Sequence, residues 1–152
     1  MSLDRATLLA AARVCGCFNL RRAARAVTRL YDQVLEPGGL RSTGFVALVL
    51  VEAEGQIALP RLASDLGIDR STLTRNLAPL RREGLVEVVH PGVARTGTAR
   101  VTAKGRAALK RCIPLWKQAQ AQFEARVGAD EWARLLVGLD SIVRAAPQRN
   151  GH

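Results

Sequence analysis

Apolar residues recur at helical spacing along the first part of the chain. Residues 4–36 contain no proline, and Cys17, Leu20 and Ala24 lie three or four positions apart. This spacing places their side chains on one face of a helix. The sequence Pro37-Gly38-Gly39 then ends the segment, because proline disfavours helical geometry in the residue before it. We therefore predict one unusually long first helix.

Two further helices are predicted in the middle of the chain. Ser42 or Thr43 is a favourable N-cap for a strongly apolar helix that ends near Gly55. After a short extended stretch, Pro60 stands in the first turn of a short helix that closes at Gly67. The apolar character of the first of these helices indicates that it is buried.

The next predicted helix has two different faces. Asp69 is a good N-cap for it. Leu73, Leu77 and Leu80 stand at i, i+4 and i+7 and predict its buried side. The residues that face the other way are Ser71, Thr74, Arg75, Ala78 and Arg82. Two short helices joined by a glycine-containing turn, the second with hydroxyls and arginines outward, are typical of a helix-turn-helix.

The remainder of the chain predicts a hairpin and two helices. Residues 85–89 and 95–102 are extended runs on either side of His90-Pro91-Gly92, so a β hairpin, or wing, is expected. Thr102 is the predicted N-cap of the helix that follows. The expected later segments are a helix over 103–127 that Pro114 bends or locally opens, a helix over 131–146 and a disordered tail over 147–152.

Composition narrows the class of protein. The chain has 152 residues, 48% of them apolar and 4% aromatic, which suits one compact domain. No apolar run reaches the roughly 20 residues that cross a bilayer, and the N-terminus lacks the pattern of a secretion signal. Three cysteines are too few and too odd in number for a disulfide scaffold. We expect free thiols, a cytoplasmic location and no membrane partner.

The charge balance indicates a polyanionic partner. The chain has 23 Lys and Arg against 13 Asp and Glu, a formal net charge of +10, and most of the basic residues are arginines. Arginine forks suit phosphates and guanine edges. The alternative is a merely solvated surface. The few aromatic residues argue against a stacking platform for single-stranded nucleic acid.

These patterns predict a mostly α fold with a small β wing. A winged helix-turn-helix DNA-binding lobe is expected over residues 37–102, with dimerisation helices over 1–36 and 103–146. The terminal helices carry more apolar surface than one lobe can cover, so we expect an obligate homodimer. Its two recognition helices would enter successive major grooves about 34–36 Å apart, on a pseudo-palindromic double-stranded operator.

The segment from Leu62 to Val86, LASDLGIDRSTLTRNLAPLRREGLV, resembles the helix-turn-helix of the MarR family of winged-helix transcription regulators. The sequence Val101-Thr102-Ala103-Lys104-Gly105 is similar to the segment that closes the wing in that family. The resemblance covers nearly the whole chain and implies a repressor, not an enzyme, that a small signal releases from its operator. One departure is Val93, which replaces the aspartate that usually braces the wing arginine, here Arg95.

Groove chemistry suggests how the candidate DNA contacts act. Arg75, one turn into the recognition helix, suits guanine O6 and N7, and Arg95 on the wing suits the minor groove. The candidates for phosphates or base edges are Arg70, Ser71, Thr72, Thr74 and Arg82. A winged helix that binds protein, with an incidental basic face, is the alternative.

The first helix also resembles that of organic-hydroperoxide sensors of the OhrR kind within the same family. The stretch CFNLRRAAR is similar to the one that holds their reactive cysteine, here Cys17. The resemblance implies a thiol switch. Tyr31 matches a tyrosine that bonds this thiol across the dimer, whereas Ser42 replaces a second tyrosine. Cys112 lies where some such sensors keep a resolving thiol, and Cys15 is an addition.

Residue chemistry leaves alternatives open for the cysteines. On one continuous helix Cys15 points about 200° away from Cys17, so at least one thiol is exposed or at the dimer seam. Cys112 is then the better disulfide partner for either. Nearby arginines favour the thiolate, which attacks peroxides or binds a soft metal or arsenical as an effector. The alternative is that all three are small buried hydrophobes. No resident cofactor is required.

Other functions also stay open. The family resemblance implies a cleft for an aromatic ligand, lined by Phe18, Phe45 and Trp116 unless these are plain core aromatics. An architectural DNA binder without an effector is a further alternative. A thiol oxidoreductase with a Cys-x-Cys site is the remote enzymatic alternative, because the flanking pattern is helical and lacks the strand-to-helix turn that such sites use. His90 and His152 have no carboxylate at a predictable spacing, so a hydrolytic triad is not expected.

Overall fold

The computed structural model describes residues 4–89 and 96–146. Helices dominate, with three short strands among them. In chain order the elements are α1 (Arg5–Val14), α2 (Gly16–Leu35), the 3₁₀ helix η1 (Glu36–Gly38), α3 (Ser42–Glu54), β1 (Ile57–Ala58), α4 (Leu59–Asp65), α5 (Arg70–Arg82), β2 (Val86–Val89), β3 (Thr98–Val101), α6 (Ala103–Val127) and α7 (Ala129–Ala145).

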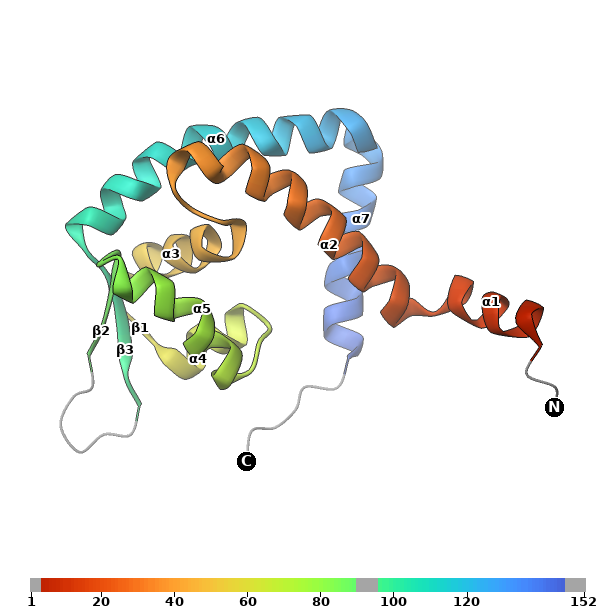
Figure 1. Cartoon of the computed structure of the whole chain (residues 1–152), viewed down its shortest axis with the longest axis horizontal. Helices are drawn as coiled ribbons and strands as arrows, with labels where there is room; N and C mark the ends of the chain where they lie inside the picture. Colours follow the sequence, from red (N-terminus) through yellow and green to blue (C-terminus); the bar gives the residue numbers. More distant parts are fainter. Residues whose placement is uncertain (1–3, 90–95, 147–152) are drawn as a thin grey trace.

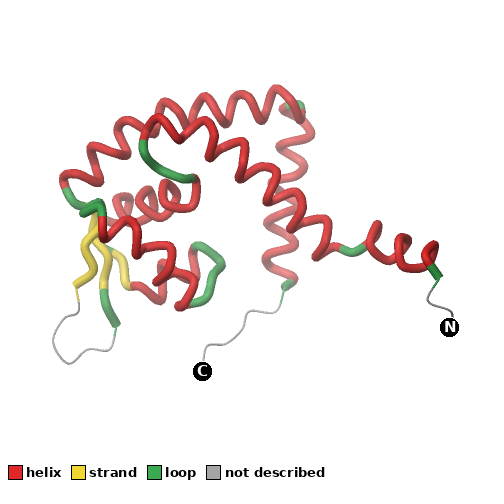
Figure 2. Tube along the Cα trace, in the orientation of Figure 1, coloured by secondary structure: helices red, strands yellow, loops and turns green. Residues whose placement is uncertain are grey.

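Two long helices lie over a small lobe. α2 packs along α6, and α3, α4, α5 and the sheet lie beneath them in the view of Figure 1. α7 turns away from the far end of α6, and α1 projects beyond the start of α2 (Figure 2). The lobe therefore has a core of its own, whereas α1 and α7 extend from the body with no buried residue.

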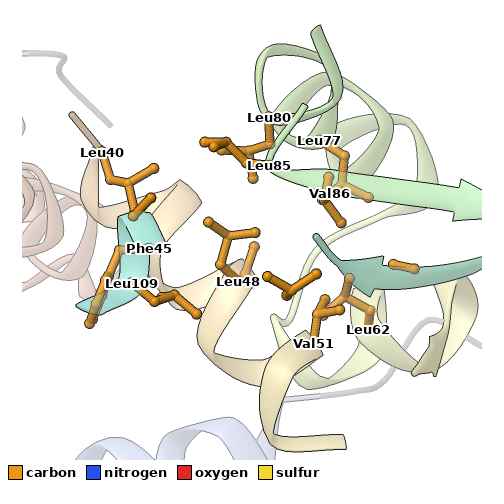
Figure 3. Packing of buried hydrophobic residues seen from close by; sticks show 14 of the residues in the cluster. Leu40, Phe45, Leu48, Val51, Leu62, Leu77, Leu80, Leu85, Val86 and Leu109 are labelled. Atoms are coloured by element: carbon orange, nitrogen blue, oxygen red, sulfur yellow. The ribbon is translucent and has the colours of Figure 1, made fainter. Parts of the chain in front are cut away.

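α3 is the centre of the hydrophobic core. Leu48 and Val51 on this helix are completely buried, as is Leu62 on α4 (Figure 3). The predicted apolar face of the recognition helix is confirmed, since its leucines are all buried against the same cluster. Those residues are Leu73, Leu77 and Leu80.

The sheet has three antiparallel strands in the order β1-β3-β2. Val86 pairs with Val101 and Val89 with Thr98, so the predicted hairpin directly follows α5. Mostly helical architecture with a small antiparallel wing is confirmed. The wing tip, including Val93 and Arg95, and the tail over 147–152 lie outside the described residues.

The prediction of one continuous first helix is wrong. The chain breaks at Cys15, which has extended backbone geometry (φ −67°, ψ 110°) and serves as the N-cap of α2. The side-chain amide of Asn19 donates to the carbonyl oxygens of Arg13 and Cys15, at 2.9 and 3.0 Å. Gly16, with low helix propensity, follows the break. This local hydrogen bonding competes with helix continuation.

The predicted cap of α3 is also wrong. Arg41 is the N-cap and makes no side-chain cap bond, and Ser42 is already the first helical residue. The backbone N–H and the hydroxyl of Ser42 both donate to Asp32 Oδ1, at 2.7 and 2.6 Å. A carboxylate on α2 thus caps α3, and this contact joins the long helix to the lobe.

The C-terminal helices differ from the prediction in smaller ways. Thr102 caps α6 as predicted, its hydroxyl accepting from the N–H of Gly105 at 3.0 Å. α6 stays helical through Pro114, so the predicted local opening is absent from this described segment, and the helix follows a curve in Figure 1. Among the described residues, no single helix is both long and apolar enough to span a membrane; Gly16–Gly38 and Ser42–Glu54 meet both criteria only as a pair bent by 72°.

Candidate nucleic-acid interface

α5 presents a polar face to solvent beside the hairpin. Its leucines point into the core, so the residues between them are directed outward. Figure 1 shows α5 and the hairpin on the side of the lobe opposite α6. The sequence candidates on α5 that lie exposed are Arg70, Ser71, Thr74, Arg75 and Arg82, with Thr72 half-buried.

Asp69 organises the start of this face. Its Oδ1 accepts from the Thr72 N–H at 2.7 Å and from the Ser71 hydroxyl at 2.6 Å. Its Oδ2 accepts from the Thr72 hydroxyl at 3.0 Å. These hydrogen bonds, led by that of Ser71, hold the pKa of the Asp69 carboxyl well below its usual range. The carboxylate is therefore ionised, and the hydroxyl protons of Ser71 and Thr72 are engaged within the helix start.

The arginines of α5 are free of ion pairs within the described part of the chain. Arg100 pairs with Glu87 at 2.9 Å and Arg106 with Glu52 at 3.5 Å, so these two have partners in the protein. Lys104 donates to the carbonyl oxygen of Glu83 at 2.7 Å. The arginines of α5 that form no ion pair with a described residue are Arg70, Arg75, Arg81 and Arg82. Arginines without ion pairs on one exposed helix suit phosphates and base edges.

The three thiols occupy different environments. Cys15 and Cys17 are exposed at the start of α2, whereas Cys112 is completely buried on α6. Burial raises the pKa of the Cys112 thiol, and a Cβ at Gly38 would lie 2.4 Å from its sulfur. Cys112 is therefore enclosed in the core. Among the described residues, no group of three or more acidic, His or Cys side chains is placed to hold a metal ion.

Tyr31 bonds within its own chain. Its hydroxyl donates to Gln120 Oε1 on α6, and Gln120 donates to Glu124 at 2.7 Å. Burial and then the negative charge of Glu124 raise the pKa of the Tyr31 phenol. Cys17 lies fourteen residues away along α2, about 21 Å at 1.5 Å per residue. The two side chains do not meet in one protomer.

The three aromatics named as candidate cleft residues lie in different environments in the protomer. Phe45 is buried and stacks on Trp116 with ring centroids 6.3 Å apart, whereas Phe18 is exposed near the start of α2. A different pocket, of about 520 Å³, lies where α2 and η1 meet α3 and α5. None of the three aromatics lines it. Its charged lining residues are Asp32, Glu36, Arg41 and Glu83. These residues are brought together only by the tertiary fold, so spacing along the chain gives no signal for them.

Known structures share this arrangement. MosR, a transcriptional regulator of M. tuberculosis solved in complex with DNA, is 40% identical, and the match covers 86% of this chain and 95% of that chain at a TM-score of 0.78. A cysteine-to-serine mutant of E. coli MarR, complexed with operator DNA, is 23% identical over 93% of this chain and 99% of that chain, at a TM-score of 0.74.

BpsR of Bordetella bronchiseptica, whose DNA binding is regulated by 6-hydroxynicotinic acid, is 21% identical, covering 86% of this chain and 95% of that chain at a TM-score of 0.75. Neither the protein-family models nor the curated proteins contain a match to the chain. The identity and coverage shared with MosR nevertheless decide the assignment. The chain belongs to the MarR family of winged-helix DNA-binding transcription regulators and is not an enzyme.

Proposed function

We propose that the protein is a homodimeric cytoplasmic repressor that places α5 in the major groove of each half of a pseudo-palindromic operator. The observation that carries this proposal is the set of exposed arginines on α5, beside the hairpin, that form no ion pair with a described residue. Support also comes from MosR, which is bound to DNA in its structure. Arg75 lies one turn into the helix, where an arginine reaches guanine.

The dimer is proposed from apolar residues that have no cover in one protomer. Most of the large exposed apolar side chains lie on the helices that leave the lobe. They are Leu8, Leu9 and Val14 on α1, Phe18 and Leu20 on α2, and Leu135, Leu136, Val137, Leu139, Ile142 and Val143 on α7. On α7 these residues include a face that runs through Leu135 and Leu139, whereas Val137 lies on the opposite face. Exposed apolar faces of this kind mark an interface. A second copy of the chain supplies an equally apolar partner.

We expect Arg75→Ala to lower affinity for the selected operator by about 1–3 kcal/mol while leaving affinity for random DNA nearly unchanged, because a base-edge contact is lost. Arg82→Ala is the matched control on the same helix. It should weaken binding to both DNAs and reduce the salt slope by about one, as a phosphate contact does. Fluorescence anisotropy with labelled duplexes over a series of salt concentrations measures both quantities. Equal losses on both DNAs for Arg75→Ala would assign Arg75 to the phosphate contacts.

The same titration tests the proposed function as a whole. A protein that neutralises several phosphates loses affinity steeply as salt rises. Wild-type affinity for duplex DNA that hardly changes between low and moderate salt would overturn the DNA-binding proposal.

We further infer that the releasing signal is directed at the exposed thiols of the α1–α2 break. Cys15 Sγ accepts from the N–H of Phe18 at 3.5 Å, so an oxidised or metal-bound sulfur would change the cap of α2. The other end of α2 contacts the lobe through Asp32 and Ser42. A shift of α2 therefore reaches the lobe that carries α5. The likeness of the Cys17 segment to hydroperoxide sensors supports the same site.

We expect a hydroperoxide or a trivalent arsenical to weaken operator binding of the wild type about tenfold or more, within the usual range of coupling energies. Cys17→Ser should abolish this response, and Cys15→Ser should reduce it, because only these two thiols are exposed. Cys112→Ser is the matched control and should respond like wild type. Operator titrations with and without each agent measure the effect. A response that depends on Cys112 alone, or on no cysteine, would contradict a switch at the break.

A ligand-responsive repressor is the second candidate, favoured by the pocket between α2 and α5. BpsR is regulated by 6-hydroxynicotinic acid, and CouR of Rhodococcus jostii RHA1 is bound to p-coumaroyl-CoA in its structure. In this chain Asp32, Glu36 and Glu83 outnumber Arg41 around the pocket, which disfavours a carboxylate ligand. Weaker operator binding in the presence of neutral or cationic aromatics, lost in Glu36→Arg, would support this candidate over the thiol switch.

A further inference from the structure

A chain of side-chain hydrogen bonds runs from the start of α5 to its candidate base-reading arginine. Thr72 Oγ1 donates to Asp69 Oδ2 and accepts from Arg75 Nη2, and both distances are 3.0 Å. Thr74, on the same turn, donates instead to the carbonyl oxygen of Arg70 at 2.9 Å. The two threonines therefore have different roles, although both were predicted to contact DNA.

We propose that Thr72 is a positioning residue, which holds the guanidinium of Arg75 in the orientation that reads a base and so sets the sequence preference of the protein. The proposal rests on the proposed function, in which α5 lies in the major groove. It assigns Thr72 a role through Arg75 rather than a direct contact with DNA.

The donors and acceptors of these groups fit this role. A threonine hydroxyl has one proton and two lone pairs. In Thr72 the proton goes to Asp69 and one lone pair accepts from Arg75, so no proton is left for a phosphate. Arg75 has five N–H donors and gives one to Thr72. Four donors remain, enough for a bidentate contact with guanine O6 and N7.

Asp69 sets the direction in which the hydrogen bonds of Thr72 run. Its carboxylate is ionised and only accepts hydrogen bonds, so the hydroxyl proton of Thr72 points toward Asp69. A lone pair of the same oxygen then faces Arg75. The opposite orientation of the hydroxyl would place its proton against a guanidinium N–H, which is unfavourable.

Arg75 differs from the other arginines of α5 because its guanidinium is hydrogen-bonded to a side chain of the protein. Arg70, Arg81 and Arg82 donate no side-chain hydrogen bond to a described residue, whereas Arg75 donates to Thr72. A long surface side chain loses rotamer freedom when it binds, and fixing it beforehand lowers that cost. Preorganisation matters most for a base contact, whose geometry is strict, and least for phosphate contacts.

The test begins with a pool of randomised double-stranded DNA from which the wild-type protein selects a preferred duplex. Arg75→Ala identifies the base pair that Arg75 reads, as the position where preference is lost. Thr72→Val then removes the hydroxyl but keeps the β-branched shape, Thr72→Ser keeps the hydroxyl, and Thr74→Val is the matched control. Affinities are measured on the selected duplex, on its single-base variants and on random DNA.

We expect Thr72→Val to bind the selected duplex about tenfold more weakly and to lose preference at the Arg75 base pair, with affinity for random DNA unchanged within about twofold. Thr72→Ser should behave like wild type. Thr74→Val should keep the base preference. In an Arg75→Ala background, Thr72→Val should add no further loss, because the group that it positions is absent.

The proposal is overturned if Thr72→Val keeps the base preference, if Thr72→Ser loses as much, or if the loss persists in the Arg75→Ala background. Should Thr72→Val unfold, Thr72→Ala replaces it, since it also removes the hydroxyl that accepts from Arg75. The same loss of preference is expected. Failure of the proposed function gives a different result, in which the wild type enriches no sequence from the pool.

Discussion

Gly105→Ala is expected to destabilise the protein by about 3 kcal/mol, at the upper end of the cost of overpacking a core. A Cβ at this position would lie 2.1 Å from the backbone oxygen of Leu85 and 2.6 Å from a methyl carbon of Val101. The Leu85 oxygen already accepts from the N–H of Thr102 at 3.1 Å, and Val101 is buried in β3. Neither neighbour can move without breaking the junction of hairpin and helix.

Urea unfolding at a fixed protomer concentration measures this effect as a shift in the midpoint. Gly16→Ala is the matched control, because a Cβ at Gly16 meets no atom within 4 Å. It should change stability by no more than about 0.5 kcal/mol. Coincident midpoints for Gly105→Ala and wild type would contradict the close packing of α6 on Leu85.

The junction at Gly105 also joins the recognition helix α5 to the long helix α6. The hydroxyl of Thr102 donates to the carbonyl oxygen of Gly84 at 2.7 Å, and Lys104 donates to that of Glu83. The end of α5 is thus bonded to the start of α6. Partial unfolding here would release α5 from the helix that sets its position, so DNA binding should fail together with stability.

The helix-turn-helix was predictable because its signals are local. The buried face is predicted by the spacing of Leu73, Leu77 and Leu80 alone. Asp69 is a residue type that strongly favours the N-cap position. Thr102 likewise marks the start of α6. Each of these residues acts within a few positions of its own place in the sequence, where pattern and structure have the same cause.

The errors lie where a distant or competing group decides the structure. The cap of α3 is the carboxylate of Asp32, ten residues earlier on α2, so the nearby hydroxyls of Ser42 and Thr43 were misleading. The break at Cys15 depends on the amide of Asn19 bonding to the carbonyls of Arg13 and Cys15. Apolar periodicity carries no information about either bond.

The candidate interface was predictable as a set of residues but not as a set of roles. A count of basic residues along the sequence treats Arg100 and Arg106 like the other arginines. In the structure both form ion pairs with carboxylates of the protein. The place of Thr72 near the start of the predicted helix likewise made it a candidate for a direct DNA contact. Its engagement with Asp69 and Arg75 depends on side-chain orientation, which only the folded structure gives.

Leu135→Glu combined with Leu139→Glu is expected to separate the proposed dimer and to weaken operator binding about 100-fold or more. The face of α7 that contacts α6 begins at Trp132, whose ring meets Phe123 edge-on at a centroid distance of 4.9 Å. The same face continues through Leu135 and Leu139, which are each still 40% exposed in the protomer.

A carboxylate buried in an apolar seam costs several kcal/mol, which exceeds what a modest dimer interface can lose. Separated protomers bind one half-site each, so the gain of about 10²–10⁴ from linking two sites disappears. Val137→Glu is the matched control, because Val137 lies on the opposite side of α7 and is 69% exposed. Analytical ultracentrifugation and operator titration measure the two effects. If Val137→Glu separates the protomers as fully as the double variant, the seam lies on a different face of α7; if neither does, α7 does not form the dimer.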